Sequence, residues 1–170
     1  DRVAPPQKAE TLAAVRACIE NYHDSELADW DRVASERRFE LDLGQIEGHE
    51  RPLVVRGYID AVYKHRGRTI VVDYKTGDRS LRYDVQAELY ILACRELFDD
   101  PVDEARIAYV GDGPDEYETV RREHDETNAL RDDIRQKLRK LDRDGYTEPA
   151  DDAPCRFCPH RNLPCSGFDR

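Results

Sequence analysis

The pattern of apolar and polar positions predicts three helices separated by groups of strands. Apolar residues recur at helical spacing in residues 8–28, 83–98 and 126–145. Short runs rich in β-branched and aromatic residues, bounded by turn residues, predict strands between these helices. The expected strands cover residues 35–43, 51–65, 70–75, 104–111 and 116–122. This order predicts an α/β domain with a mixed central sheet flanked by helices.

The last part of the chain has a different composition. Residues from 146 onward are rich in proline, contain three of the five cysteines and show no regular apolar period. Such a segment cannot bury enough apolar surface to form a core of its own. We therefore expect a folded core over residues 1–150 and an irregular, cysteine-containing tail over residues 151–170 that binds a metal or a cluster.

Composition changes this picture little. The chain is 39% apolar and 38% charged, with a net charge of −10. An acidic surface is typical of a halophilic protein, and it is also expected of a protein that avoids polyanions. The net charge does not choose between these interpretations, because the local electric field at a site decides nucleic-acid binding. No apolar run reaches membrane-spanning length and no signal peptide opens the chain, so we expect a cytoplasmic protein without a membrane partner. The chain contains no methionine, which suggests a domain of something longer.

Two acids and a lysine interrupt the expected hairpin around Gly67. Asp60 lies within "YIDAV", and thirteen positions later Asp73 ends "IVVD" and is followed by Tyr74 and Lys75. Alternate side chains of a strand share a face, so Asp73 and Lys75 point the same way. If the strands pair through the turn, both carboxylates and the ammonium group converge.

This grouping suits the hydrolysis of a phosphodiester. Mg²⁺ is typically held by one or two carboxylates together with waters and substrate phosphate. The backbone carbonyl of Tyr74 could add a ligand, and Lys75 could orient the attacking water or neutralise developing charge. A single Asp-x-Lys is most often a surface ion pair, but the second acid, Asp60, on the neighbouring strand favours a metal site.

The segments "GYIDAVY" and "IVVDYKTGD" closely resemble the nuclease core of the RecB/AddB type, within the PD-(D/E)xK superfamily. "QAELY", with Gln86 and Tyr90 one helical turn apart, resembles the Q-x-x-x-Y element of that family. "SERRFEL", with Glu36, resembles its E-x-x-F strand. The resemblance runs from about residue 35 to the C-terminus and implies a restriction-endonuclease-like core.

The resemblance also implies a function for each matching residue. It implies Mg²⁺- or Mn²⁺-dependent hydrolysis of DNA, with Asp60 and Asp73 as metal ligands, Lys75 as the catalytic lysine, and Gln86 and Tyr90 as substrate-positioning residues. Related nucleases act in recombination and repair, often as exonucleases joined to a UvrD/RecB-type helicase domain or subunit. The chain has no G-x-x-x-x-G-K-[ST] sequence, so any helicase ATP site must lie elsewhere.

The resemblance leaves one family residue without a counterpart. Members usually carry a histidine in a helix upstream of the core, where it contributes to the metal site. His23 lacks the small-residue context of that histidine, and we expect it to be a surface residue. The counterpart would then precede residue 1.

Cys155, Cys158 and Cys165 form a C-x2-C-x6-C pattern. An odd cysteine count without a secretion signal disfavours disulfides, and grouped thiolates suit either Zn²⁺ or an iron–sulfur cluster. His160 could complete a zinc site, although only one residue separates it from Cys158, which makes joint ligation awkward. The family resemblance favours a 4Fe–4S cluster with a fourth cysteine far upstream. We expect Cys18 and Cys94, both in predicted helices, to pack in the core instead.

Basic residues gather toward the end of the core. Between Arg121 and Arg143 there are eight Lys or Arg and six acids, and Arg131, Arg135 and Arg139 recur every four residues. Such a row is usually a solvated helix face, and binding of DNA phosphates is the alternative. Two further functions remain open: a non-catalytic DNA-binding module of the same fold, and a zinc-binding adaptor.

Overall fold

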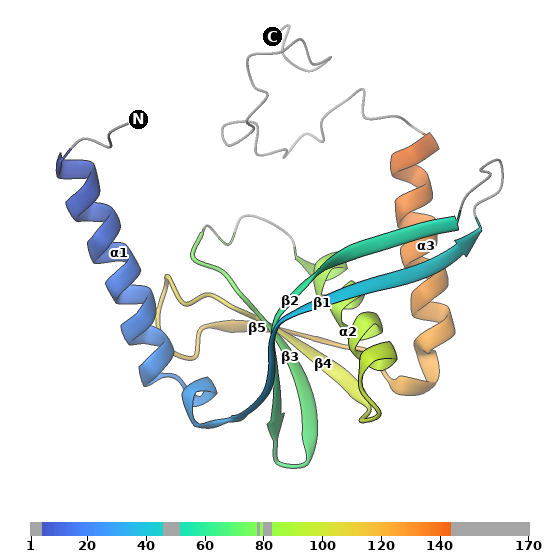
Figure 1. Cartoon of the computed structure of the whole chain (residues 1–170), viewed down its shortest axis with the longest axis horizontal. Coiled ribbons are helices and arrows are strands. Elements are labelled where there is room, and N and C mark those ends of the chain that lie inside the picture. Colours follow the sequence, from blue (N-terminus) through green and yellow to red (C-terminus); the bar gives the residue numbers. More distant parts are fainter. Residues whose placement is uncertain (1–4, 46–51, 78, 80–82, 144–170) are drawn as a thin grey trace, which may run out of the picture.

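The computed structural model describes residues 5–45, 52–77, 79 and 83–143. Five strands form one sheet, with helices packed around it (Figure 1). The elements are α1 (Pro5–Asp24), η1 (Glu26–Asp29), β1 (Asp31–Gln45), β2 (Pro52–His65), β3 (Arg68–Tyr74), α2 (Asp84–Leu97), β4 (Val102–Ala108), β5 (Tyr117–Arg121), η2 (His124–Glu126) and α3 (Thr127–Arg143). The expected mixed α/β architecture is confirmed. The cysteine tail lies outside the described residues.

Several expected boundaries were wrong: the fourth strand covers Val102–Ala108 and not residues 104–111, and the first helix and strand differ as well. The first helix does not run to residue 28, because it ends at Asp24 and the extended backbone of Ser25 separates it from the 3₁₀ helix η1. The first strand begins at Asp31, four residues before the expected start. Apolar spacing alone does not show this, because Asp31, Arg32 and Val33 are all exposed and show no alternation of buried and exposed positions.

The strands follow one another across the sheet in the order β1-β2-β3-β4-β5. Only β3 and β4 pair in parallel, and α2 supplies the crossover between them. The β2–β3 hairpin closes through Arg66 and Gly67, both with positive φ, between the paired residues His65 and Arg68. Two consecutive positive φ angles are typical of a tight hairpin turn. This turn fixes the register that brings Asp60 and Asp73 side by side.

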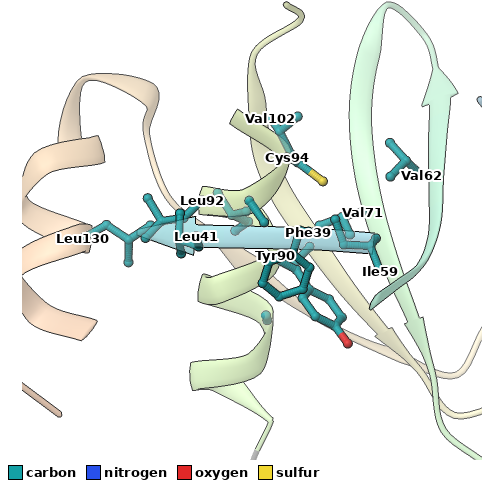
Figure 2. Close-up of a cluster of buried hydrophobic side chains, with 14 of the residues drawn as sticks. Phe39, Leu41, Ile59, Val62, Val71, Tyr90, Leu92, Cys94, Val102 and Leu130 are labelled. Carbon is teal, nitrogen blue, oxygen red and sulfur yellow. The ribbon is translucent and has the colours of Figure 1, made fainter. Parts of the chain in front are cut away.

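The main core lies between the sheet and α2. Figure 2 shows Tyr90 of α2 against Phe39 of β1, with Leu41 and Leu92 nearby. The Phe39 and Tyr90 rings meet edge to face at 5.9 Å. Cys94 is fully buried here, as expected, and burial raises the pKa of its thiol to about 12. A thiol in that environment stays protonated, which disfavours metal binding.

A second, smaller cluster covers the other face of the sheet. It contains Leu27 and Trp30 above Tyr63, Ile70 and Val72 of the strands. Tyr74 packs beside it, and its hydroxyl lies 2.5 Å from that of Tyr63. The side chain of Tyr74 therefore points away from the face that carries Asp73.

Helix α1 leaves most of its apolar side uncovered. Leu12, Val15 and Ile19 are 60%, 51% and 54% exposed. Cys18 is half-buried and lines a groove of about 480 Å³ rather than packing in the core, so that expectation was wrong. Within the described residues, no helix is long and apolar enough to span a membrane.

The arginine row of α3 is not a free solvated face. Arg131 donates to the carbonyl of Asp42 and to Glu96, and Arg135 donates to the carbonyl of Gln45 at 2.6 Å. Two of the three arginines thus contact the end of β1 while their side chains remain partly exposed, and the phosphate-binding alternative stays a prediction.

Candidate active site

The candidate site forms where β3 ends. Ile70, Val71 and Val72 are buried because β3 lies between two strands and under side chains on both faces. Asp73 continues this buried run and is only 2% exposed. Lys75 follows the strand, and its backbone N–H donates to the carbonyl of Ala108 at 2.8 Å. The chain therefore stays beside β4 while the Lys75 side chain turns back toward Asp73.

Asp60 reaches the same place from β2. Its Oδ2 accepts a hydrogen bond of 2.9 Å from the backbone N–H of Tyr74. Tyr74 is the residue between Asp73 and Lys75, so this hydrogen bond holds the Asp60 carboxylate at the end of β3. The two acids are close enough for the charge of Asp60 to raise the pKa of Asp73. The convergence expected from strand alternation is present.

Three groups surround the ammonium of Lys75. Its Nζ lies 2.6 Å from Oδ2 of Asp73 and donates to Oε1 of Gln86 at 3.0 Å. It also lies 4.3 Å above the centre of the Tyr83 ring. Gln86 in turn donates from Nε2 to the hydroxyl of Tyr90 at 2.9 Å. Gln86 and Tyr90 thus connect α2 to the lysine.

Burial sets the electrostatics of this site. It raises the pKa of the Asp73 carboxyl, the ion pair with Lys75 opposes that shift, and the charge of Asp60 adds to it. Burial also raises the pKa of Tyr90 to about 12, partly offset by the hydrogen bond from Gln86 and increased by the charges of Asp73 and Asp60. Tyr90 therefore keeps its proton at neutral pH and can act as a donor. A cation bound beside Asp60 and Asp73 would stabilise the charged form of both carboxylates.

A family model described as the PD-(D/E)XK nuclease superfamily matches residues 2–163. The chain belongs to this superfamily. Its members are usually nucleases and generally use Mg²⁺ or Mn²⁺, and the sheet flanked by helices agrees with their restriction-endonuclease-like fold.

Comparison with curated proteins found no match. Among the matching solved structures is that of SSO0001, which is 13% identical, with 95% of this chain and 71% of that chain covered at a TM-score of 0.45.

The residues at this PD-(D/E)XK site fit a hard divalent cation. Asp73 Oδ2 is buried, and the ammonium of Lys75 lies 2.6 Å from it. Asp60 is half-buried and at the edge of solvent. Two neighbouring carboxylates, one of them partly exposed to solvent, match the usual protein contribution to Mg²⁺. No group of three or more His, Cys, Asp or Glu side chains suited to a metal occurs among the residues described.

Two residues named in the sequence analysis lie outside this cluster. His23 is exposed on α1, as expected, with its ring 5.7 Å from that of Tyr22. Glu36 is exposed and has a φ of 47°. It lies between Ser35 and Arg37, whose strand partners are Ala61 and Ile59, so Glu36 stands opposite Asp60. A left-handed conformation at a non-glycine residue is strained, and it marks the point where β1 passes the site.

Sequence reasoning missed Tyr83. It is the N-cap residue of α2 and packs against the main core, so its ring is held below the lysine. A signal was available, because Tyr83 precedes Gln86 by three residues and Tyr90 by seven. That spacing places all three on one helix face. The motif itself names only the glutamine and the second tyrosine.

Proposed function

We propose that this chain is a metal-dependent deoxyribonuclease that hydrolyses phosphodiester bonds. One observation carries the proposal: a PD-(D/E)XK chain brings Asp60, Asp73 and Lys75 together at the end of β3. Fold alone does not decide function, because one fold hosts many activities. The pair of carboxylates and the adjacent lysine are groups suited to metal-dependent hydrolysis of a phosphodiester.

In this proposal Asp60, Asp73 and the backbone carbonyl of Tyr74 hold Mg²⁺ or Mn²⁺. When bound, the cation polarises the phosphodiester and lowers the pKa of a water molecule. Lys75 orients that water and offsets the negative charge that develops on the phosphate. The water oxygen forms a new bond to phosphorus, the bond to the departing strand breaks, and the departing oxygen takes up a proton.

Gln86 and Tyr90 act as positioning residues for substrate and lysine. Gln86 accepts from Lys75 and donates to Tyr90, so the three form one directed chain. The Tyr90 hydroxyl is protonated because burial raises its pKa to about 12. It therefore presents a donor toward Asp73 without adding negative charge to the site.

The wider context of the activity rests on the RecB/AddB resemblance. We infer a cytoplasmic exonuclease that acts in DNA recombination or repair on strands delivered by a UvrD/RecB-type helicase. The core would span residues 1–150. The tail, residues 151–170, would hold a 4Fe–4S cluster, or Zn²⁺ as the alternative, through Cys155, Cys158 and Cys165. Iron and zinc analysis of the purified chain distinguishes the two metals.

A second candidate is a non-catalytic DNA-binding module. One observation favours it: within the described residues only two acids, and no histidine, converge at the metal site. Such a module would bind DNA through the same sheet without cutting it. It predicts that Asp73 can be changed without loss of any DNA-directed activity.

A cutting assay tests the proposed function. Labelled single-stranded and duplex DNA are incubated with the protein and Mn²⁺ or EDTA, at low and at high salt. Wild type should cut only with Mn²⁺. Asp73→Asn should lower the rate by at least about a hundredfold, because asparagine has nearly the same shape as aspartate but lacks the charge that binds the metal.

Asp31→Asn is the matched control, since Asp31 is an exposed acid at the start of β1. Its rate should equal that of wild type. DNA binding by wild type with no cutting under any of these conditions would support the binding module instead.

A further inference from the structure

Tyr74 connects the two faces of the sheet at the candidate site. It is the residue between Asp73 and Lys75, and its backbone N–H donates to Oδ2 of Asp60 at 2.9 Å. In the proposed function its carbonyl also binds the metal. Its ring lies on the opposite face of the sheet, against the smaller cluster that contains Tyr63. The position of Tyr74 therefore sets both the Asp60 carboxylate and its own carbonyl.

Backbone pairing holds Tyr74 on one side only. Pairing of β3 with β4 continues to Tyr74 and Ala108. Pairing of β2 with β3 ends at Ala61 and Val72, two residues earlier. On that side the N–H of Tyr74 is held by the carboxylate of Asp60 instead, and a rotatable side chain restrains a backbone less than a strand ladder does. The anchoring of the Tyr74 ring therefore matters for the site.

Tyr63 supplies a rigid anchor for this ring. Its side chain is fully buried, and its backbone is paired on both sides, with Arg32 of β1 and Ile70 of β3. Its hydroxyl lies 2.5 Å from that of Tyr74. Because a buried hydroxyl that loses its hydrogen-bond partner destabilises the fold, this contact opposes any withdrawal of the Tyr74 ring.

Tyr22 of α1 closes the other side of the Tyr74 ring. The two rings meet edge to face at 5.8 Å, and the Tyr22 hydroxyl lies 3.3 Å from that of Tyr63. Asn21 fixes this end of α1, because its Nδ2 donates to the carbonyl of Val110 at 2.9 Å. Helix α1 and η1 lie on the side of the strands away from α2 (Figure 1). The Tyr74 ring is thus held from the face opposite to Gln86 and Tyr90.

We propose that Tyr63 is a positioning residue for the metal centre and that it acts through the ring of Tyr74. The Tyr63 hydroxyl holds the Tyr74 ring, and the backbone of Tyr74 holds the Asp60 carboxylate. Such outer contacts affect metal affinity because ligands work only when held within about half an ångström of their positions. The proposal rests on the proposed nuclease function and adds to it a residue from the far face of the sheet.

The Tyr63 hydroxyl separates positioning from packing. The Tyr63 ring also packs against Trp30, with the ring centres 6.1 Å apart, and a phenylalanine would keep that contact. Tyr63→Phe therefore removes the hydroxyl contacts and leaves the ring in place. A packing role predicts a loss of stability alone, whereas the positioning role also predicts weaker metal binding.

Calorimetric titration of Mn²⁺ into the full chain tests the proposal without DNA. Tyr63→Phe should bind Mn²⁺ about fivefold more weakly, a moderate loss because pairing with β4 still restrains Tyr74. Tyr74→Phe removes the other hydroxyl of the same contact and should give a similar loss. The double variant should lose no more than either single variant, since both remove one shared bond.

Tyr117→Phe is the matched control. Tyr117 packs beside the same cluster, but its hydroxyl donates to Glu26 at 3.2 Å rather than to a tyrosine behind the site. This variant should keep the Mn²⁺ affinity of wild type. Thermal unfolding of every variant measures how much stability each hydroxyl contributes.

Hydrogen exchange of the Tyr74 amide gives a second readout, in EDTA and without metal. The bond to Asp60 protects this N–H, so Tyr63→Phe should speed its exchange by about tenfold. Val71 is a fully buried residue of β3 whose amide reports global unfolding. The acceleration at Tyr74 should exceed any acceleration at Val71.

The outcomes separate this proposal from the function beneath it. Wild-type Mn²⁺ affinity in Tyr63→Phe and Tyr74→Phe would overturn the positioning role and leave the nuclease proposal intact. Additive losses in the double variant would also overturn it, because the two hydroxyls would then not act through one bond. Absence of both Mn²⁺ binding and cutting in wild type would overturn the proposed function itself.

Discussion

At the residue scale, Lys75 owes its position to three neighbours on different elements. Asp73 pairs with its charge, Gln86 accepts from it, and the Tyr83 ring lies below it. Alternation along β3 predicts the first contact, and the Q-x-x-x-Y motif predicts the second. The third has only the spacing of Tyr83 before Gln86 and Tyr90 as a signal, and it was missed because an aromatic residue at a helix start is usually a packing residue.

The contact with Tyr83 leads to a prediction about rate. Tyr83→Leu should lower kcat by about ten- to hundredfold and leave KM nearly unchanged, because a displaced lysine affects the reaction more than substrate binding. Tyr83→Phe keeps the ring face and should retain the wild-type kcat. Steady-state kinetics on a labelled single strand measure both constants. Equal losses in the Leu and Phe variants would show that the ring face is not what holds Lys75.

At the element scale, charged side chains join the strands and helices around the site. The buried Glu104 of β4 accepts from Arg106 of the same strand and from Arg121 of β5, and it pairs with Arg68 of β3. The arginines of α3 secure β1 in a similar way. Apolar period predicted the strands and helices themselves. It could not predict these charged contacts, because they depend on which elements become neighbours.

Glu104 gives a prediction for the dependence of stability on pH. Burial would raise the pKa of its carboxyl, but hydrogen bonds from Arg106 and Arg121 outweigh burial and hold that pKa below its usual range. The unfolded chain therefore binds the proton more readily, and the stabilisation is present above the usual pKa near 4.5 and lost as the pH falls through the lowered value.

Thermal unfolding between pH 7 and pH 3 measures this effect. Wild type should lose more stability on acidification than Glu104→Gln, whose amide cannot titrate. Glu20→Gln, which changes an exposed glutamate of α1, serves as the control and should follow wild type. Parallel curves for wild type and Glu104→Gln would contradict the assignment.

At the scale of the whole molecule, the candidate catalytic groups gather at the end of the central strand β3 of a strongly acidic protein. The net charge of −10 gives no indication of a nucleic-acid substrate, because the groups at the site and not the net charge decide it. The motifs in the sequence located Asp60, Asp73, Lys75, Gln86 and Tyr90 in advance.

The central claim is that Asp60 and Asp73 form a metal centre that Lys75 serves without binding the metal. Calorimetric titration of Mn²⁺ into wild type, Asp73→Asn and Lys75→Gln, followed by a cutting assay on the same samples, tests it most directly. Wild type should bind and cut, Asp73→Asn should bind Mn²⁺ at least about tenfold more weakly, and Lys75→Gln should bind Mn²⁺ but fail to cut. Unchanged Mn²⁺ affinity in Asp73→Asn would contradict the claim.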